Sequence, residues 1–290
     1  MTLLLQVSDP HFGTERAPVM QALLRLARAH APDVLLLSGD ITQRGRRAQY
    51  AAARAFVERL GVPRILAIPG NHDVPLFNVA ARVLTPYREH VRAFGAELEP
   101  QLVTEDLLLL ALNTTRPWRR KDGEVSPDQI ERVARRLEQA QPAQLRIVAV
   151  HQPVAVTRPE DRTNLLHGHE AAVRRWAAAG CDLIVGGHIH LPYVLPLSAR
   201  FLDLPREVWA VQAGTALSWR VRHEADNSVN LIRTLPAPGG PTPRACMVER
   251  WDYVESARAF ARVARDELRL GAQRHAAARM ADPAESGRPS

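Results

Sequence analysis

The most regular pattern in this chain is a series of short apolar runs, each followed at once by Asp, Asn or His. Short runs rich in Leu, Ile and Val are typical of strands buried on both faces. Open α/β folds bind ligands just beyond the carboxyl ends of such strands, so side chains far apart in the sequence can meet there. The runs are LLLQVSDPH ending at Asp9 and His11, VLLLSGD ending at Asp40, RILAIPGNHD ending at Asn71, His72 and Asp73, RIVAVH ending at His151, and DLIVGGHIH ending at His188 and His190.

The rest of the pattern predicts helices between these strands and mostly strands after them. Apolar spacing and capping residues predict helices over residues 17–30, 46–60, 76–94, 127–140, 168–179 and 256–278. Further strands are expected near residues 98–104, 107–113, 194–197, 207–212, 228–235 and 246–253. We therefore expect an α/β fold in which two mixed β-sheets pack face to face with helices outside, a four-layer αββα sandwich.

The spread of the polar run ends sets the expected domain organisation. The Asp, Asn and His residues that follow the apolar runs extend from Asp9 to His190, so a domain boundary between them would divide the site that they form. We expect one domain over residues 1–254, a C-terminal helix over 255–280 packed on it, and a disordered tail over 281–290. Residues 236–243 are rich in Pro and Gly and predict a turn between strands.

Composition supports one compact enzyme domain rather than a membrane protein. Hydrophobic residues make up 46% of the 290, yet no apolar run approaches the roughly 18 residues of a membrane span. The first apolar run reaches Asp9 at once, which leaves no room for a signal peptide, so we expect a cytoplasmic protein. Cys181 and Cys246 lack CxxC spacing and predict buried free thiols.

The basic charge changes this interpretation little. A net charge of +7 normally favours nucleic acid as a partner. Here Lys121 is the only lysine, a skew that looks like the codon composition of a GC-rich genome. The arginines lie mostly at exposed helical spacings among Glu and Asp, so nucleic-acid binding is the minority interpretation.

The last predicted helix, over residues 255–280, is expected to cover a sheet edge or to mediate contact in a homodimer.

The polar residues at the run ends predict a metal centre. Aspartates, imidazoles and one Asn amide oxygen suit Mn, Fe, Zn or Co, and no thiolate is present to favour copper or iron–sulfur chemistry. Nine such side chains follow the strands, which is too many for one ion. Two divalent ions about 3.5–4 Å apart, sharing a carboxylate and a hydroxide, fit the count and are typical of hydrolysis at phosphorus. Manganese or iron is the first expectation, and zinc also fits.

Taken in order, these motifs match a known family. The set DxH, GD, GNHD, H and GHxH after successive strands resembles the calcineurin-like metallophosphoesterases. The motifs cover Asp9 to His190, and the resemblance extends through the β-rich stretch to about Trp251. Each motif alone is a weak signal, because GD and HxH occur by chance in many proteins. The alternative is that these residues are core histidines and capping aspartates without a common site. Because five motifs occur in order after matching strands, this is the minor interpretation.

The resemblance implies a role for each residue. Asp9, His11 and His190 would hold the first metal ion, Asn71, His151 and His188 the second, and Asp40 would bridge both. His72 would stabilise charge on phosphorus or protonate the leaving oxygen. The nucleophile would be a metal-bridging hydroxide in line with the leaving group. Asp73 would orient His72 or its loop, with a helix cap as the alternative.

Several other residues are candidates for contacting the substrate. The loop RPWRRK at residues 116–121 follows a strand expected to end near the site, so Arg116, Arg119 and Trp118 could clamp a phosphate and stack on a base. The alternative is that residues 116–121 form a solvated surface loop with no contact to the substrate. The long polar connection at residues 214–228 offers Arg220, Arg222 and Asn227. His167 and His169 precede a helix, where a capping or exposed role is favoured over a substrate contact.

The reaction class is better defined than the substrate, which we expect to be a small phosphoester. The short insertions and the GNHD motif look most like the bacterial phosphodiesterases that include class III cyclic nucleotide phosphodiesterases. The alternatives are a phosphomonoesterase and a UDP-diacylglucosamine pyrophosphatase, although the latter group usually carries Arg where His72 stands. Serine/threonine phosphoprotein phosphatases carry GNHE rather than GNHD. A non-catalytic scaffold is the hypothesis from a different class, and the complete ligand set disfavours it.

Overall fold

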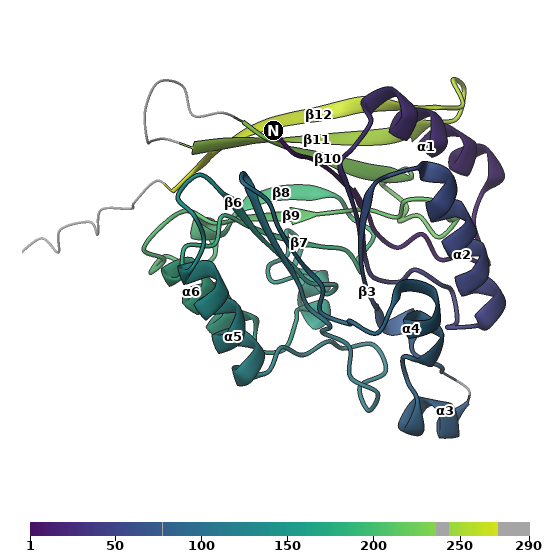
Figure 1. Ribbon diagram of the computed structural model, residues 1–290, viewed down its shortest axis with the longest axis horizontal. Helices are drawn as coiled ribbons and strands as arrows, with labels where there is room; N and C mark the ends of the chain where they lie inside the picture. Colours follow the sequence, from purple (N-terminus) through teal and green to yellow (C-terminus); the bar gives the residue numbers. More distant parts are fainter. Residues whose placement is uncertain (77, 236–243, 272–290) are drawn as a thin grey trace, which may run out of the picture.

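The computed structural model describes residues 1–76, 78–235 and 244–271, which form two six-stranded sheets with helices on their outer faces. The order of strands is β12-β11-β10-β1-β2-β3 in the first sheet and β4-β5-β6-β7-β9-β8 in the second. In Figure 1, helices α1 and α2 lie on one side of the molecule and α5 and α6 on the opposite side, with the sheets between them. The predicted four-layer sandwich is confirmed.

In each sheet, a parallel portion carries the motifs and antiparallel strands complete the edges. The first sheet contains parallel β1 (Leu3–Val7), β2 (Val34–Ser38) and β3 (Arg64–Ile68), extended by antiparallel β10 (Ser228–Thr234), β11 (Arg244–Val254) and β12 (Ala259–Leu270). The second contains parallel β5 (Leu107–Ala111), β6 (Leu145–Ala149), β7 (Leu183–Gly186) and β9 (Trp209–Gln212), with antiparallel β4 (Gln101–Val103) and β8 (Tyr193–Pro196) at its edges. The parallel strands therefore direct their carboxyl ends toward one region in each sheet.

Three apolar cores hold the four layers together. One core lies between the first sheet and helices α1 (Ala17–His30) and α2 (Arg47–Leu60), and another lies between the second sheet and helices α5 (Pro127–Glu138) and α6 (His169–Ala178). The third joins the sheets to each other, with Leu4 and Leu36 of one sheet and Leu109 and Ile147 of the other fully buried. Alternate residues of each central strand enter different cores, which explains why these strands are apolar on both faces.

Most of the predicted elements are present, and one predicted helix is divided. Instead of one helix over 76–94, the structure has α3 (Val79–Leu84) and α4 (Arg88–Phe94). Pro86 lies between them, and a proline disfavours helical backbone at the residue before it, here Thr85. The side chain of Asn78 caps α3 by accepting a hydrogen bond from the amide of Ala81 at 2.9 Å. Short 3₁₀ turns occur at Asn71–Asp73, Pro159–Asn164 and Leu197–Ala199.

The predicted C-terminal helix over 255–280 is wrong where the structure describes it. Residues Ala259–Leu270 form β12, which pairs with β11 along its whole length. The helical spacing of apolar residues in this segment was misleading, because pairing with a neighbouring strand outweighs local preference. The folded domain therefore extends past residue 254 to Leu270. The predicted tail over 281–290 and the predicted turn over 236–243 lie outside the described residues.

None of the described helices is long and apolar enough to cross a lipid bilayer. Both cysteines, Cys181 and Cys246, are buried free thiols, as the sequence predicts.

Candidate functional site

The polar residues that follow the strands converge at one site between the two sheets. Strands β1, β2 and β3 of the first sheet deliver Asp9, His11, Asp40 and Asn71, and strands β6 and β7 of the second deliver His151, His188 and His190. Every one of these residues is buried or half-buried. The sandwich thus brings together ligands that are up to 181 positions apart in the chain, from Asp9 to His190.

The backbone is strained at five of these positions. Asp9, His11, Asp40, His188 and His190 have φ angles between 46° and 74°, and only two other non-glycine residues in the described chain have positive φ. Non-glycine residues rarely adopt this conformation, which costs on the order of 1–3 kcal/mol each. Such strain concentrates where side-chain placement matters more than local backbone preference, which is what a ligand cluster requires.

Four side chains form the first ligand cluster. The ligand atoms of Asp9, His11, Asp40 and His190 all lie within 4.8 Å of one another. His190 Nε2 is 3.2 Å from Asp9 Oδ1 and 3.1 Å from His11 Nε2. Four carboxylate or imidazole groups around one point are an arrangement that a borderline divalent ion accepts.

A second cluster shares Asp40 with the first. It consists of Asp40, His151 and His188, with His151 Nε2 at 3.3 Å from Asp40 Oδ1. Because one carboxylate belongs to both clusters, two ions held there would be neighbours bridged by Asp40. Asn71 precedes His72, whose backbone amide donates to Asp40 Oδ1 at 2.8 Å.

Buried atoms without hydrogen-bond partners show that the residues fit metal ions. Asp9 Oδ1, Asn71 Oδ1, His151 Nε2 and His188 Nδ1 are all buried and have no such partner. An unsatisfied buried polar atom costs roughly 1–3 kcal/mol, so a set of them in one place calls for an explanation. Two metal ions would provide it, because each of these atoms is a donor of the type that Mn, Fe or Zn accepts.

Neighbouring carbonyl groups fix the orientation of two imidazoles. Nδ1 of His151 donates to the carbonyl of Ser38 at 2.9 Å, and Nδ1 of His190 donates to that of Arg220 at 2.7 Å. A carbonyl can only accept, so both rings keep the Nε2 lone pair for a ligand.

The charge state of the imidazoles also suits ligation. Burial lowers the pKa of His11 to about 3 and that of His188 to about 3, so both are neutral near neutral pH. Burial also disfavours the charged form of His151, but the negative charge of Asp40 outweighs it and raises the pKa of His151 to about 9. A divalent ion at Nε2 would take the place of that proton.

A glycine allows two of the motifs to approach each other. A Cβ atom on Gly70 would collide with the backbone nitrogen and Oδ1 of Asp40 and would crowd Nε2 of His151. The Gly of the GNHD segment is therefore needed because the two loops touch at this point.

His72 lies beside the clusters, and its ring contacts one cluster residue and two residues outside the clusters. The ring packs edge-on against His11 with centroids 4.9 Å apart, and its Nδ1 is 2.9 Å from the carbonyl of Gln43. Because a carbonyl accepts, Nδ1 carries a proton and Nε2 is the atom available for proton exchange. The guanidinium of Arg220 is 3.4 Å from Nε2 and donates to Gln43 Oε1 at 2.8 Å. His72, Arg220 and Gln43 thus form a polar group at the edge of the metal site.

Asp73 holds two loops together. Its carboxylate accepts hydrogen bonds from the amides of Ile41, Thr42 and Gly70 and from the hydroxyl of Thr42, at 2.7 to 2.9 Å. These contacts fix the loop after β2 to the loop after β3. Both oxygens are engaged and neither contacts the ring of His72, so Asp73 is a positioning residue rather than a group that acts on substrate.

Of the three predicted substrate arginines, the structure places only Arg220 beside the predicted catalytic histidine. Arg116 donates to the carbonyls of Asn113 and Thr115 and to Gln129, while Arg119 forms an ion pair with Glu124 at 2.8 Å. These partners engage both guanidinium groups, and the prediction that Arg116 and Arg119 clamp a phosphate stays a prediction.

Sequence reasoning missed the amide of Gln43 near the site, and it included Arg120 and Lys121 only as members of the 116–121 loop. A crevice of about 180 Å³ beside Asn71 and His72 is also lined by Gln43 and Arg120. The charge of Lys121 acts on His188. Arg120 and Lys121 belong to the loop at residues 116–121, and Gln43 lies three residues after Asp40. Their closeness in the chain to predicted site residues was therefore the available signal that they lie near the site.

The other candidate contacts have structural partners. Arg222 binds both carboxylate oxygens of Asp161 at 2.9 Å, and Asn227 donates to the carbonyls of Thr215 and Ser218. His167 is half exposed beside Asp122, and His169 binds the carbonyl of Leu166.

Two curated proteins are related to this chain in sequence. A probable cyclic nucleotide phosphodiesterase of Synechococcus sp. is 30% identical over 210 residues, which cover 67% of this chain and 76% of that protein. A glycerophosphodiester phosphodiesterase of Enterobacter lignolyticus is 36% identical over 84 residues, 24% of this chain and 29% of the other.

Solved structures share the fold. A dimetal phosphatase from Danio rerio superposes with a TM-score of 0.58 at 13% identity, over 93% of this chain and 99% of the other. A purple acid phosphatase from yellow lupin gives 0.60 at 11% identity, over 87% of this chain and 51% of the other. The profile of the calcineurin-like phosphoesterases matches residues 2–192, which include every residue of both ligand clusters. The chain therefore belongs to the calcineurin-like phosphoesterase family.

Proposed function

We propose that this protein is a dinuclear-metal-dependent phosphodiesterase that hydrolyses small phosphodiesters, with cyclic nucleotides as the first candidates. The observation that carries the proposal is the single carboxylate of Asp40 shared by two ligand clusters. Asp9, His11 and His190 would hold one ion, Asn71, His151 and His188 the other. Bound together, two divalent ions supply Lewis acidity toward phosphoryl oxygens and an ionised water as the nucleophile. Manganese, iron and zinc all fit these donors.

His72 is assigned to the leaving group. Its Nδ1 proton is held by the carbonyl of Gln43, so a proton passed to the departing oxygen would come from Nε2. Arg220 lies 3.4 Å from that nitrogen, where its positive charge can attract a phosphoryl oxygen next to His72. Gln43 fixes both groups, one through its carbonyl and the other through its side chain.

The choice of a diester rests on charge and on related sequences. A monoester carries nearly two negative charges near neutrality, whereas a diester carries one and needs fewer cations around it. Arg116 and Arg119 are occupied by neighbouring groups of their own loop region, which leaves less cationic surface for a dianion. The names of both curated relatives describe phosphodiesterases. A cytoplasmic location and a homodimer stay predictions from the sequence.

A substrate panel tests the proposal. After reconstitution with each metal, kcat/KM should be higher for bis(p-nitrophenyl) phosphate and for 2′,3′- or 3′,5′-cyclic nucleotides than for p-nitrophenyl phosphate. The reason is that a diester carries one negative charge fewer than a monoester and needs fewer cations around it. Higher values for the monoester with every metal would contradict the proposal and favour a phosphomonoesterase. Preference for a nucleotide-sugar lipid would favour the UDP-diacylglucosamine pyrophosphatase alternative, whose usual Arg is replaced here by His72.

The assignment of Arg220 is tested by comparing two arginines. Arg220→Ala should raise KM for a diester by about tenfold, since one charge-assisted hydrogen bond to a phosphoryl oxygen is lost. Arg119→Ala is the matched control, because it removes an equal charge whose ion pair with Glu124 is partly exposed and contributes little. Steady-state kinetics of both variants gives the answer. A larger effect of Arg119→Ala than of Arg220→Ala would contradict the central role of Arg220 and favour Arg119 as the main phosphate contact.

A further inference from the structure

Helix α3 buries its charged residue and exposes its apolar residues, the opposite of an ordinary surface helix. Its only charged residue, Arg82, is buried and donates to the backbone carbonyls of Pro75, Pro117 and Arg119. Its apolar residues Val79, Val83 and Leu84 are 68%, 69% and 78% exposed. A surface helix that serves only the fold turns its apolar side inward, so this arrangement indicates that something else covers the outer side.

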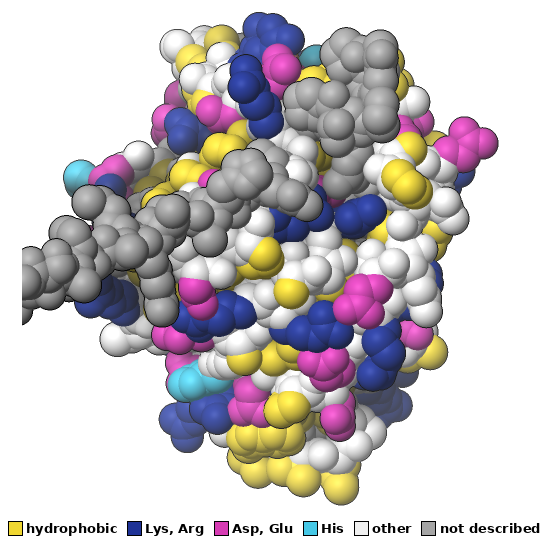
Figure 2. Space-filling view, turned by 90° about the vertical axis from the view of Figure 1, so that its left-hand side faces the viewer, with side chains coloured by type: hydrophobic (Ala, Val, Ile, Leu, Met, Phe, Trp, Pro, Cys, Tyr) yellow, Lys and Arg dark blue, Asp and Glu magenta, His cyan; other side chains and the backbone are white. Residues whose placement is uncertain are grey.

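The exposed apolar side of α3 is continuous with a tryptophan. Arg82 binds the carbonyls on both sides of Trp118, which fixes the loop of Trp118 against the helix, and Trp118 is 73% exposed. Leu76, 48% exposed, precedes the helix. We call Leu76, Val79, Val83, Leu84 and Trp118 the α3 patch. Hydrophobic side chains gather at the lowest point of the molecule in Figure 2, the level at which α3 lies in Figure 1.

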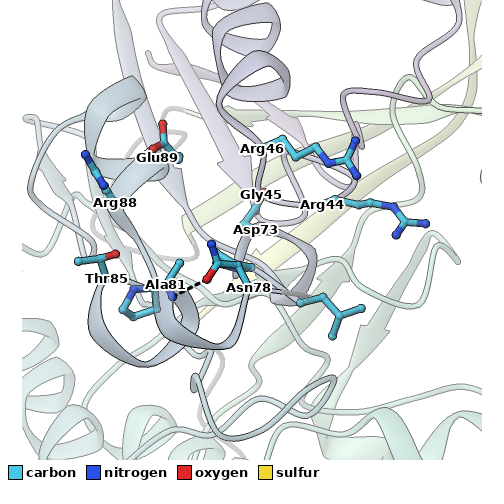
Figure 3. Close-up of a pocket in the computed structure, with 12 residues that line it drawn as sticks. Arg44, Gly45, Arg46, Asp73, Asn78, Ala81, Thr85, Arg88 and Glu89 are labelled. Carbon is cyan, nitrogen blue, oxygen red and sulfur yellow. Dashed lines mark hydrogen bonds between the residues drawn. The ribbon is translucent and has the colours of Figure 1, made fainter.

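Cations surround the α3 patch. A pocket of about 330 Å³ separates α3 from the start of α2 and is lined by Arg44, Arg46 and Arg88. The side chains of Arg44 and Arg46 extend in the same direction at one end of this pocket, and Arg88 lies at the other (Figure 3). Burial lowers the pKa of the Arg82 guanidinium, and the charge of nearby Arg120 lowers it further.

Few negative charges balance these cations. Within the described part of the chain, no carboxylate lies at ion-pairing distance from Arg46, Arg88 or Arg120. Two acidic residues line the pocket: Glu89 is paired with Arg92 at 2.5 Å, and the buried carboxylate of Asp73 accepts hydrogen bonds from the amides of Ile41 and Gly70. The surface around α3 is therefore apolar at its centre and cationic at its margin.

We propose that the α3 patch docks on the surface of an anionic lipid bilayer. Exposed aliphatic residues and a tryptophan enter the boundary between headgroups and acyl chains, and arginines beside them attract anionic headgroups. The cationic margin favours this occupant over a second copy of the chain, because two copies related by a two-fold axis would bring like charges together. Leu76 also lines the crevice beside His72, so docking turns the opening of the metal site toward the headgroups.

Vesicle binding by the full chain tests the proposal without any measurement of turnover. The protein should sediment with vesicles of phosphatidylglycerol and phosphatidylcholine, and about tenfold less with phosphatidylcholine alone or in about 0.5 M NaCl. The combined substitutions Val79→Ser, Val83→Ser and Leu84→Ser should reduce the bound fraction about tenfold, and Arg46→Gln with Arg88→Gln should do so at low salt. Leu202→Ser, which removes a residue 83% exposed outside the α3 patch, should bind as the parent does.

Two further measurements separate the outcomes. Trp118→Phe should abolish most of the blue shift of tryptophan emission that vesicles cause. Melting temperatures of all variants should match the parent, because the changed side chains are exposed. Equal binding by the triple-serine variant, or no binding to anionic vesicles by the folded parent, would overturn the proposal. So would dimerisation without vesicles that the triple-serine variant abolishes, since the α3 patch would then be an interface between copies. None of these results depends on which phosphoester is cleaved.

Discussion

Asp40→Ala is expected to lower kcat/KM for a phosphodiester at least about 10³-fold and to reduce bound metal from two equivalents to one or fewer. Asp40 is the only residue common to both ligand clusters, so its removal takes a ligand from each ion. The substitution also affects His72, because Asp40 Oδ1 accepts a hydrogen bond from the backbone amide of His72 at 2.8 Å. The predicted catalytic imidazole would lose the contact that places it beside the metal ions.

Metal analysis by mass spectrometry, performed with the kinetics, checks this expectation. Asp128→Ala is a suitable control, because it removes an exposed carboxylate in the first turn of α5 and should leave both readings within about twofold of the parent. Two full metal equivalents in Asp40→Ala, together with most of the activity, would refute the bridging role. Retention of both metals with loss of activity would limit Asp40 to positioning His72.

His72→Ala should lower kcat by about 10²–10⁴ while the metal content stays at that of the parent. His72 belongs to neither ligand cluster, and its ring nitrogens face Gln43 and Arg220 rather than the ligand atoms. The deficit should be small for p-nitrophenolate esters, whose leaving group is stable without a proton, and large for a ribose or alkyl leaving group.

A leaving-group series measured for parent and variant distinguishes the roles open to this imidazole. An equal deficit across the series would assign His72 to stabilising charge on phosphorus instead of protonating the leaving oxygen. Loss of one metal equivalent would make it a ligand. His167→Ala provides the comparison, since His167 is a half-exposed histidine beside Asp122 and should behave as the parent does.

The metal ligands could be predicted from the sequence because strand and ligand are adjacent in the chain. A run such as Leu3–Val7 is long and apolar enough to identify a buried strand, and the residue that follows it must lie at the edge of the sheet. Helices α1 and α5 were likewise predictable, and Ser126 caps α5 directly before the predicted helix start at residue 127. These features depend on contacts over a few residues, which the local pattern determines.

Orientation of the arginines depended on partners that the sequence does not reveal. Nothing local distinguishes Arg116 or Arg119 from Arg220. The first binds Gln129, the second pairs with Glu124, and only the third reaches Gln43 and His72. Each guanidinium binds whichever oxygen the fold brings nearest, so its role depends on residues far away in the chain.

The sequence by itself determined the central strands, the covering helices and the residues able to bind metal, because burial on both faces and ligand chemistry leave a local signature. Only the tertiary structure decided that Ala259–Leu270 is a strand. It also places Asp40 in both ligand clusters, a role that the family resemblance implied but that the residues alone did not reveal. The segment has apolar spacing compatible with a helix, and its pairing with β11 supplies the hydrogen bonds that select the strand. The shared carboxylate likewise results from two sheets packing together, since the second cluster takes His151 and His188 from the sheet opposite Asp40. His151 and His188 are more than a hundred positions after Asp40 in the chain, and no local pattern encodes the distance between side chains so far apart in sequence.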